Sequence, residues 1–313
     1  MRIGIDIGGS KVAAGLVNRQ GRVVSRKKIP VDKQKTYPRV RDDIALLIKE
    51  LISENGMEKG RIERIGIASA GQIDRETGNV LFSPNLGWRN VPLRADLEEI
   101  CCAKTSIEND VNAAVYGEWR FNLLKGARNV LGVYVGTGIG GGIIIDGKVY
   151  RGFSNVGGEV GHIILNPYGY PCNCGGTGCF EAYCGGSYIV ERARRGLESG
   201  YRGKLWDILG GDLAILHAGH IEEGYLLGDD LCVTLWREVV EYMGAALAGL
   251  ANLLNPEIIV LGGGVVYGTQ YLIDEIRPIV EKRAMAPSVK GLRIVRAKLE
   301  EDAAIIGAAF IEA

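Results

Sequence analysis

Residues 162–179 contain the side chains of this chain whose chemistry is most distinctive. His162 is followed by Cys172, Cys174 and Cys179 within one glycine-rich stretch. Three thiolates and one imidazole make a tetrahedral ligand set for Zn²⁺, and glycines let a chain turn tightly around an ion. Because such a set leaves no open coordination position, the sequence predicts a structural zinc site.

Two carboxylates flank these candidate ligands. Glu159 precedes His162 by three residues, and Glu181 follows Cys179 by two. On a helical turn Glu159 would share a face with His162. A zinc ion bound here would hold both carboxylates in place, so we expect the metal to position acids and not to catalyse.

Glycine-rich hairpins are the second distinctive feature. Residues 2–7 alternate apolar side chains, Gly8-Gly9-Ser10 forms a turn, and residues 12–17 form a second apolar run. This pattern predicts a β-hairpin, which a third strand over residues 23–29 extends into an antiparallel meander. An amphipathic helix from Val40 to Asn55 and a strand over residues 65–68 are expected next.

The opening hairpin recurs further along the chain. Residues 3–8 align with residues 131–136, and in each copy a glycine-rich tip leads into another apolar strand. Such a duplication predicts two similar lobes whose hairpin tips face a shared cleft. The alternative is chance, because strand–turn–strand segments resemble one another.

Gly136, Gly138 and Gly141 also satisfy the dinucleotide pattern GxGxxG. That fingerprint should open a helix, whereas residues 143–145 are three isoleucines typical of a strand. A glycine hairpin tip instead exposes backbone N–H groups to phosphate oxygens. A plain tight turn is the alternative, but the glycines at 262–264 after a strand at 258–261 favour nucleotide binding.

Asp110 lies between a short strand over residues 105–107 and a helix expected to begin near Val111. An aspartate in this place can simply cap the helix. The adjacent Asn109 and Asn112 favour a polyhydroxylated ligand instead, and Asp110 could then accept a hydroxyl proton during phosphoryl transfer. Asp6, in the first hairpin, suits a hydrated Mg²⁺, unless it only bonds to its own turn.

Composition excludes some classes of protein. The 313 residues include 37 basic and 37 acidic side chains, so no overall charge favours nucleic acid or an anionic membrane. Neither a basic-apolar leader nor a run of about 20 apolar residues occurs, and we expect a cytoplasmic protein. Seven cysteines, an odd number, suit a metal site and buried thiols better than disulfides.

Seven short motifs occur in order along almost the whole chain: DIGGSK from Asp6, SPNLGW from Ser83, ENDVNAA from Glu108, GTGIGGG from Gly136, GGEVGH from Gly157, CNCGGTGCFE from Cys172 and LGGGV from Leu261. By these motifs the chain resembles the ROK family of sugar kinases, and within it the bacterial and archaeal glucokinases. The resemblance implies an α/β, actin-like ATPase (ribonuclease H-like) fold with two lobes and a cleft between them. We expect a small lobe over residues 1–112, with a C-terminal helix at 303–313 packing back on it, and a large lobe over residues 113–302.

The same resemblance implies an ATP-dependent kinase for the 6-hydroxyl of a hexose, with Asp110 as general base. Its cofactors would be ATP, Mg²⁺ and a structural Zn²⁺ held by His162, Cys172, Cys174 and Cys179. The sugar contacts implied are Asn85, Asn109, Asp110, Glu159, His162 and Glu181. The nucleotide contacts expected are Asp6, Gly8, Gly9, Ser10, Lys11, Gly136, Thr137, Gly138, Gly262, Gly263 and Gly264.

Some alternatives stay open. Ser10 stands where many members of the family carry threonine, and Cys184 makes the loop after Glu181 atypical. The hexose is most simply glucose, but N-acetylmannosamine, N-acetylglucosamine, mannose, fructose or allose would differ only at the sugar contacts. A non-catalytic sugar sensor is a second possibility, although no room for a helix-turn-helix domain precedes Ile3. The helix expected from Asp230 to Leu254 has apolar residues on more than one face, which predicts a homodimer or homotetramer.

Overall fold

The computed structural model describes residues 1–31, 34, 36–57, 62–122, 126–269 and 271–311. The chain forms two compact units. The first unit consists of Met1–Arg128, Gly142–Gly158 and Lys298–Ala313, and the second unit of Asn129–Gly141 and Glu159–Ala297.

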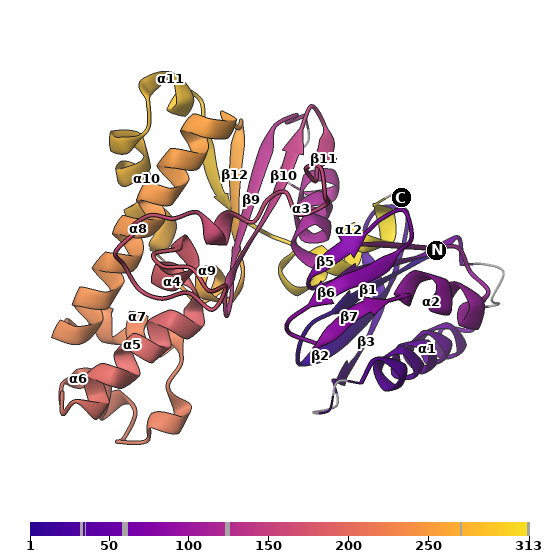
Figure 1. Cartoon of the computed structure of the whole chain (residues 1–313), viewed down its shortest axis with the longest axis horizontal. Coiled ribbons are helices and arrows are strands. Elements are labelled where there is room, and N and C mark those ends of the chain that lie inside the picture. The colour runs from indigo at the N-terminus through magenta and orange to yellow at the C-terminus, as the bar shows by residue number, and fades with distance from the viewer. Residues whose placement is uncertain (32–33, 35, 58–61, 123–125, 270, 312–313) are drawn as a thin grey trace. The chain divides into compact units, whose positions relative to one another are not determined.

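A five-stranded sheet forms the centre of the first unit, in the order β3-β2-β1-β4-β8 (Figure 1). The strands are β1 (Arg2–Ile7), β2 (Lys11–Val17), β3 (Val23–Pro30), β4 (Arg64–Ser69) and β8 (Thr105–Asn109). β2 pairs antiparallel with both β1 and β3, which confirms the predicted meander. β4 lies parallel to both β1 and β8, so β1, β4 and β8 all end at the same edge of the sheet.

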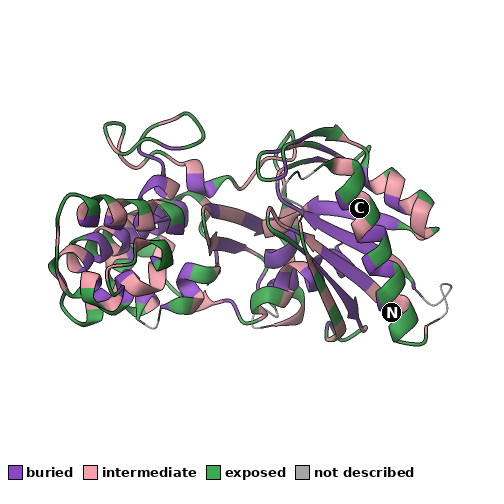
Figure 2. Cartoon of the chain, turned by 90° about the horizontal axis from the view of Figure 1, so that it is seen from below, coloured by how far each residue is buried: buried purple, intermediate pink, exposed green. Residues whose placement is uncertain are grey.

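Helices cover both faces of this sheet. Ile3, Ile5 and Ile7 of β1 pack in one core with α1 (Tyr37–Glu54) and α2 (Leu93–Cys101). On the other face α12 (Ala303–Phe310) contacts β1, β4 and α3 (Asp110–Phe121). Figure 2 shows the central strands of the sheet largely buried and the outer sides of the covering helices exposed, while the edge strand β3 has no buried residue. A smaller antiparallel sheet of β5 (Gln72–Asp74), β6 (Asn79–Ser83) and β7 (Trp88–Val91) belongs to the same unit.

Besides residues 1–112 and 303–313, the first unit holds residues 113–128, 142–158 and 298–302. Contacts of α3 contribute to this composition. Its Glu118 side chain is 1% exposed and accepts hydrogen bonds from the backbone N–H groups of Lys298 and Leu299 at 2.7 and 2.6 Å. The whole of α3 is therefore packed into the first unit together with the segment that leads into α12.

The second five-stranded sheet has the order β11-β10-β9-β12-β13. Its strands are β9 (Val130–Val135), β10 (Ile139–Ile145), β11 (Lys148–Tyr150), β12 (Ile258–Gly262) and β13 (Arg293–Arg296). β9 pairs with β10, β12 lies parallel to β9, and β13 lies parallel to β12. The hairpin and the parallel strands of this sheet thus have the same order as those of the first sheet. This confirms the prediction that the two sheets are alike. β10 also confirms that a strand, and not a helix, follows the glycines at 136–138.

Helices make up most of the rest of the second unit. They are α4 (Phe180–Cys184), α5 (Gly186–Glu198), α6 (Lys204–Ile208), α7 (Ala218–Leu226), α8 (Asp230–Leu254), α9 (Gly264–Gly268), α10 (Leu272–Arg283) and α11 (Ala286–Val289). Short 3-10 turns occur at η2 (Val160–His162), η3 (Leu213–Ile215) and, in the first unit, η4 (Glu300–Asp302). Both ends of α8 lie where the sequence predicted them.

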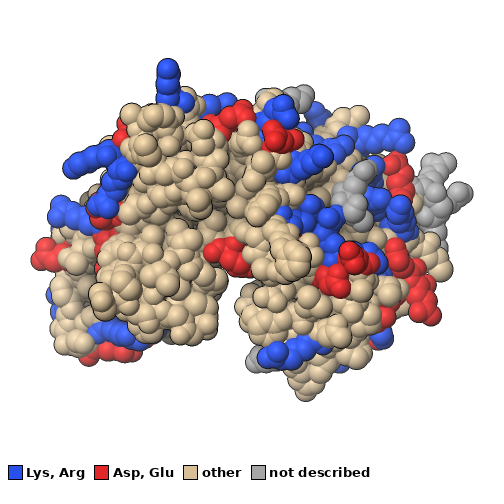
Figure 3. Space-filling view, turned by 45° about the horizontal axis from the view of Figure 1, so that its top comes forward, with Lys and Arg blue, Asp and Glu red and all other residues tan. Residues whose placement is uncertain are grey.

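The surface carries charged side chains of both signs. On the face drawn in Figure 3, acidic side chains lie beside basic ones, as equal numbers of both would lead one to expect.

Among the described residues, no helix has the length and apolar character that crossing a membrane requires.

Candidate functional site

The first unit gathers two carboxylates at the edge where its parallel strands end. Asp6 of β1 pairs in register with Ala68 of β4, and Asn109, the last residue of β8, pairs with Ser69. Asp110 follows directly as the first residue of α3. Ligand sites of open α/β sheets lie outside the carboxyl ends of their strands, so this edge is a candidate binding site.

Asp6 carries an electrostatic signature of such a site. Its pKa is raised to about 7, mainly by burial and next by the nearby carboxylate of Asp110, while Lys11 acts in the opposite direction and Glu301 adds a smaller increase. Desolvation and a like charge both disfavour the ionised carboxyl. A divalent cation would favour the ionised form, so the residues present fit a hydrated Mg²⁺.

Asn109, and not Asp110, occupies the N-cap position of α3. The side-chain oxygen of Asn109 accepts hydrogen bonds from the N–H groups of Val111 and Asn112 at 3.0 and 3.1 Å. Its amide nitrogen donates to the carbonyl oxygen of Gly71 at 3.3 Å. Asp110 follows the cap, and its Oδ1 shares the N–H of Val111 at 3.0 Å. Helix capping therefore accounts for Asn109 but does not account for Asp110.

Glu108 is a functional candidate that the sequence interpretation missed. Its carboxylate is 2% exposed, and Oε2 accepts from Nε and Nη2 of Arg151 at 2.8 and 2.7 Å. Arg75 lies 3.7 Å from the same oxygen, while Oε1 accepts the N–H of Asn109 at 3.1 Å. Buried charges need such partners. The signal in the sequence was a glutamate in an otherwise buried strand. Glu108 fixes the connection between β8 and α3, where Asp110 lies.

Residues 8–11 form the tip of the first hairpin, here called the first tip. The N–H of Gly8 donates to the carbonyl oxygen of Lys11 at 3.0 Å, which closes the turn. Lys11 is exposed and lies 3.8 Å from Glu301. A side chain at Gly9 would meet Cβ of Asn85 at 3.0 Å, so the sugar contact expected at Asn85 lies against the first tip.

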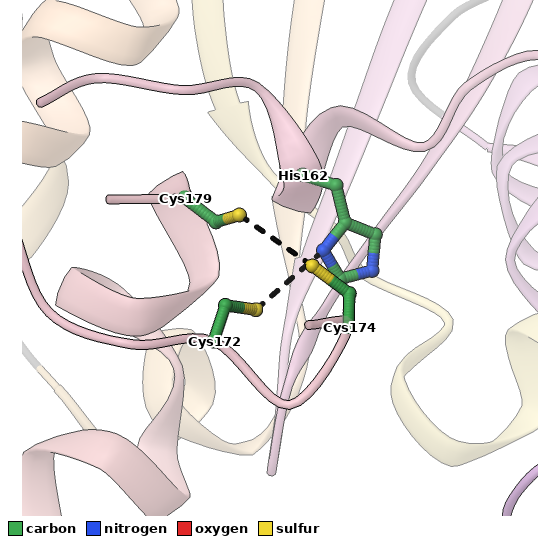
Figure 4. Close-up of side chains that lie close together, drawn as sticks. All are labelled: His162, Cys172, Cys174 and Cys179. Carbon is green, nitrogen blue, oxygen red and sulfur yellow. Dashed lines mark hydrogen bonds between the residues drawn. The ribbon is translucent and has the colours of Figure 1, made fainter. Parts of the chain in front are cut away.

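The second unit brings together the four predicted zinc ligands, here called the Cys/His cluster. One ligand atom from each of His162, Cys172, Cys174 and Cys179 lies within 4.8 Å of the others. Sγ of Cys174 lies 3.7 Å from Sγ of Cys179, and Sγ of Cys172 lies 3.8 Å from Nδ1 of His162 (Figure 4). A tetrahedron with Zn–S bonds of about 2.3 Å has edges of about 3.8 Å, so the cluster fits Zn²⁺.

The thiols of the cluster differ in acidity. The pKa of Cys179 is raised to about 12, mainly by burial and next by hydrogen bonds with the neighbouring thiols. The N–H of Gly176 lowers the pKa of Cys174. Because thiolates are the ligands, zinc binding here releases protons and weakens as the pH falls.

Turns of the chain set the positions of the cluster's ligands. Gly178, just before Cys179, has a φ of +73°, and a Cβ there would lie 1.6 Å from the carbonyl oxygen of Asn166. Only glycine fits this conformation and this space. His162 ends the turn η2, and its N–H donates to the carbonyl oxygen of Glu159 at 3.1 Å. Nδ1 of His162 faces the thiols (Figure 4), which leaves Nε2 for another partner.

Residues 136–138 form the second tip, which α4 and α5 hold in place. Oε2 of Glu181 accepts the N–H of Ile139 at 2.7 Å. The carbonyl oxygens of Gly136 and Thr137 accept the N–H groups of Gly186 and Ser187 at 2.9 and 3.0 Å. A Cβ at Gly138 would lie 2.3 Å from Oε2 of Glu181, so glycine makes room for the carboxylate.

The candidate residues fall into two sets, one in each unit. The first unit contains Asp6, Gly8, Gly9, Ser10, Lys11, Asn85, Asn109 and Asp110. The second unit contains Gly136, Thr137, Gly138, Glu159, His162, Cys172, Cys174, Cys179, Glu181, Gly262, Gly263 and Gly264. Within the second unit, Gly263 precedes α9 with a φ of 91°, and a Cβ there would lie 2.4 Å from the carbonyl oxygen of Val135 in β9.

Known proteins are similar to this chain in sequence and in fold over almost its full length. The ROK family pattern matches residues 2–312. Glucokinases of Streptomyces coelicolor and Thermotoga maritima are each 35% identical over 312 residues, which cover 99% of this chain and 96% of each relative. The crystal structure of a ROK family glucokinase from Streptomyces griseus in complex with glucose and AMPPNP has 34% identity and a TM-score of 0.83, covering 98% of this chain and 97% of that one.

Two features define the class of fold. Each of the two similar sheets is built from three consecutive strands and two further parallel strands, and the chain is similar to solved structures. The chain has an α/β fold of the actin-like ATPase (ribonuclease H-like) type. With a match from residue 2 to residue 312, it belongs to the ROK family.

Proposed function

We propose that this protein is an ATP-dependent glucokinase, which transfers the γ-phosphoryl group of ATP to the 6-hydroxyl of glucose. The observation that carries the proposal is the pair Asp6 and Asp110 at one sheet edge, beside a glycine hairpin, in a chain 35% identical to named glucokinases. A phosphoryl-transfer site needs a cation-binding carboxylate and a base that accepts the hydroxyl proton.

In the proposed reaction Asp110 orients the 6-hydroxyl and accepts its proton. The oxygen then forms a bond to the γ-phosphorus while the bond between that phosphorus and the bridging oxygen of ADP breaks. Mg²⁺, held through water by Asp6, would supply positive charge to the phosphates. Within each unit, backbone N–H groups of the tip are proposed to bind phosphate oxygens, and in the second unit residues 262–264 would lie near the adenosine.

Each unit contributes its own proposed sugar contacts. They are Asn85, Asn109 and Asp110 in the first unit, and Glu159, His162 and Glu181 in the second. The Cys/His cluster would act structurally, because all four tetrahedral positions are filled by protein ligands. The expected two-lobe division, homodimer or homotetramer and cytoplasmic location stay predictions of the sequence.

Glucose is the substrate proposed because the relatives reported above are named glucokinases. Kinases for N-acetyl amino sugars, mannose, fructose or allose would use the same base with a different arrangement of sugar contacts. A sensor that binds sugar without turnover would have no need of a base at Asp110.

Product analysis tests this proposal. Purified protein is incubated with MgATP and glucose, and the products are identified by phosphorus NMR. We expect glucose 6-phosphate and ADP in equal amounts. Phosphorylation at another hydroxyl would contradict the assignment of the site, and the absence of any sugar phosphate with glucose or the other hexoses would contradict the kinase.

A further inference from the structure

We propose that Glu181 links the Cys/His cluster to the second tip, so that zinc and nucleotide bind cooperatively. This inference rests on the proposed function, because it takes the second tip to be a phosphate-binding loop. It goes further by making the metal a determinant of nucleotide affinity and by naming the side chain responsible. All the residues involved belong to the second unit.

The second tip is held on the side that faces α4 and α5. The carbonyl oxygens of Gly136 and Thr137 accept N–H groups from Gly186 and Ser187, and the hydroxyl of Ser187 donates a further bond to Thr137 at 2.8 Å. In a trans peptide the N–H points opposite to the carbonyl of the same unit. The N–H groups of Thr137 and Gly138 therefore both point away from α5, an arrangement suited to phosphate oxygens.

Glu181 supplies the fixed point on the β10 side of this tip. Its Oε2 accepts the N–H of Ile139 at 2.7 Å, and Gly138 leaves the space that the carboxylate occupies. Ile139 is the first residue of β10 and directly follows the tip. Movement of Glu181 would therefore release the peptide that ends the tip.

The same side chain is tied to the metal ligands. Cys179 occupies the N-cap position of α4, and Glu181 is the second residue of that helix. Oε1 of Glu181 lies 4.0 Å from Sγ of Cys172. With zinc bound, Cys172 is a thiolate and no longer donates to Oε1, so the link runs through Cys179, which is fixed two residues before Glu181 at the start of α4. The Cys/His cluster fits the ion, so α4 and its carboxylate are ordered by the metal.

Cooperativity follows from this shared element. Zinc orders α4 and sets Glu181, Glu181 sets the second tip, and a tip already in place loses less entropy when nucleotide binds. Linkage requires the reverse effect of equal size: bound nucleotide must raise the affinity for zinc. One hydrogen bond to a charged acceptor sets the scale, and we expect a change of roughly tenfold in each affinity.

The test measures the affinity for Zn²⁺ by competition with a chelating dye, with and without saturating ADP. In the wild-type protein ADP should raise the zinc affinity roughly tenfold. In Glu181→Ala the effect of ADP should vanish. Glu257→Ala is the matched control, because Glu257 accepts the N–H of Asn129 at 3.0 Å just before β9 and so bonds to the same hairpin at its far end. This control should keep the full effect.

The outcomes separate the inference from the proposed function. ADP binding without any change in zinc affinity, or an equal change in Glu181→Ala, would overturn the inference alone. Failure of the zinc-loaded wild-type protein to bind ADP would overturn the proposed nucleotide site and the inference with it. If Glu181→Ala does not fold, Glu181→Gln replaces it: a neutral acceptor should weaken the ADP effect several-fold, and an effect equal to the wild type would contradict the link.

Discussion

The two hairpins share a topology but differ in what surrounds their tips. β1–β2 and β9–β10 each stand beside a parallel strand in sheets of the same plan. In the aligned sequences Asp6 of the first hairpin corresponds to Tyr134 of the second. The first hairpin is thus charged at its edge, where Asp110 lies close enough to raise the pKa of Asp6.

The second hairpin has its carboxylate supplied from outside the sheet. Glu181 reaches Ile139 from α4, a helix fixed by a candidate metal ligand. The same arrangement of strands therefore serves two purposes. The first hairpin concentrates charge where a proton and a cation are handled, and the second holds backbone donors in a fixed direction. Changes at the first edge should therefore affect proton transfer and cation binding, and changes in the second hairpin should affect the placement of its backbone donors.

The largest effect expected is that of Asp110→Ala. Loss of a general base lowers kcat by roughly 10²- to 10⁴-fold, while the fold should persist because Asn109, and not Asp110, caps α3. Steady-state kinetics and thermal denaturation measure the two quantities. Asp146→Asn is the control, since Asp146 pairs with Arg128 on the surface of the same unit. If Asp110→Ala turned over at close to the wild-type rate, Asp110 would not be the general base.

Asp6→Asn should have the next largest effect, a loss of roughly 10- to 100-fold in affinity for MgADP. In the wild type this affinity should fall as the pH drops through about 7, where Asp6 becomes protonated. The variant should lack this pH dependence. Titration calorimetry at several pH values measures the affinity for MgADP. The same dependence of this affinity on pH in both proteins would argue against a cation at Asp6.

The raised pKa of Asp6 also predicts a cost in stability. From its ordinary value of 3.8 up to about 7, the folded protein binds more protons at this group than the unfolded chain does. The contribution of Asp6 to the free energy of unfolding therefore decreases as the pH rises through that window. Asp6→Asn should accordingly raise the Tm at pH 8 while lowering nucleotide affinity. A lower Tm would contradict the assigned direction.

The smallest effects should come from the second tip, where two glycines provide a matched pair. A Cβ at Gly138 would collide with Glu181, whereas a Cβ at Gly136 would meet no described atom within 4 Å. Gly138→Ala should lower the Tm by a few degrees, since the methyl group would displace the Glu181 carboxylate from the N–H of Ile139, and a hydrogen bond to a charged group contributes about 1.5–3 kcal/mol. Gly136→Ala should leave the Tm unchanged. Equal melting temperatures in calorimetry would show that Glu181 does not hold the second tip.

Much of this framework could be predicted from the sequence because local patterns determine it. Alternation of apolar residues predicted β1, β2 and β3, and apolar residues at helical spacing predicted α1 and the full extent of α8. The recurrence of the hairpin predicted the likeness of the two sheets. The spacing of His162, Cys172, Cys174 and Cys179 predicted a cluster that long-range folding does assemble.

Long-range contacts were beyond the sequence interpretation. Glu108 bonds to Arg151 and Glu118 to Lys298 and Leu299, across separations that no local pattern encodes. These contacts draw residues 113–128, 142–158 and 298–302 into the first unit. The N-cap of α3 was uncertain for a similar reason, because Asn109 and Asp110 are both good caps and only the backbone geometry selects between them.

A panel of sugars tests whether this protein is an ATP-dependent glucokinase. The wild-type protein is supplied with MgATP and, one at a time, with glucose, mannose, fructose, allose, N-acetylglucosamine and N-acetylmannosamine, and ADP release is followed for each. We predict the highest kcat/KM with glucose, and no sugar-dependent release in Asp110→Ala. Release that is independent of sugar, or absent with every hexose, would contradict an ATP-dependent glucokinase, and a preference for another hexose would contradict the assignment of glucose.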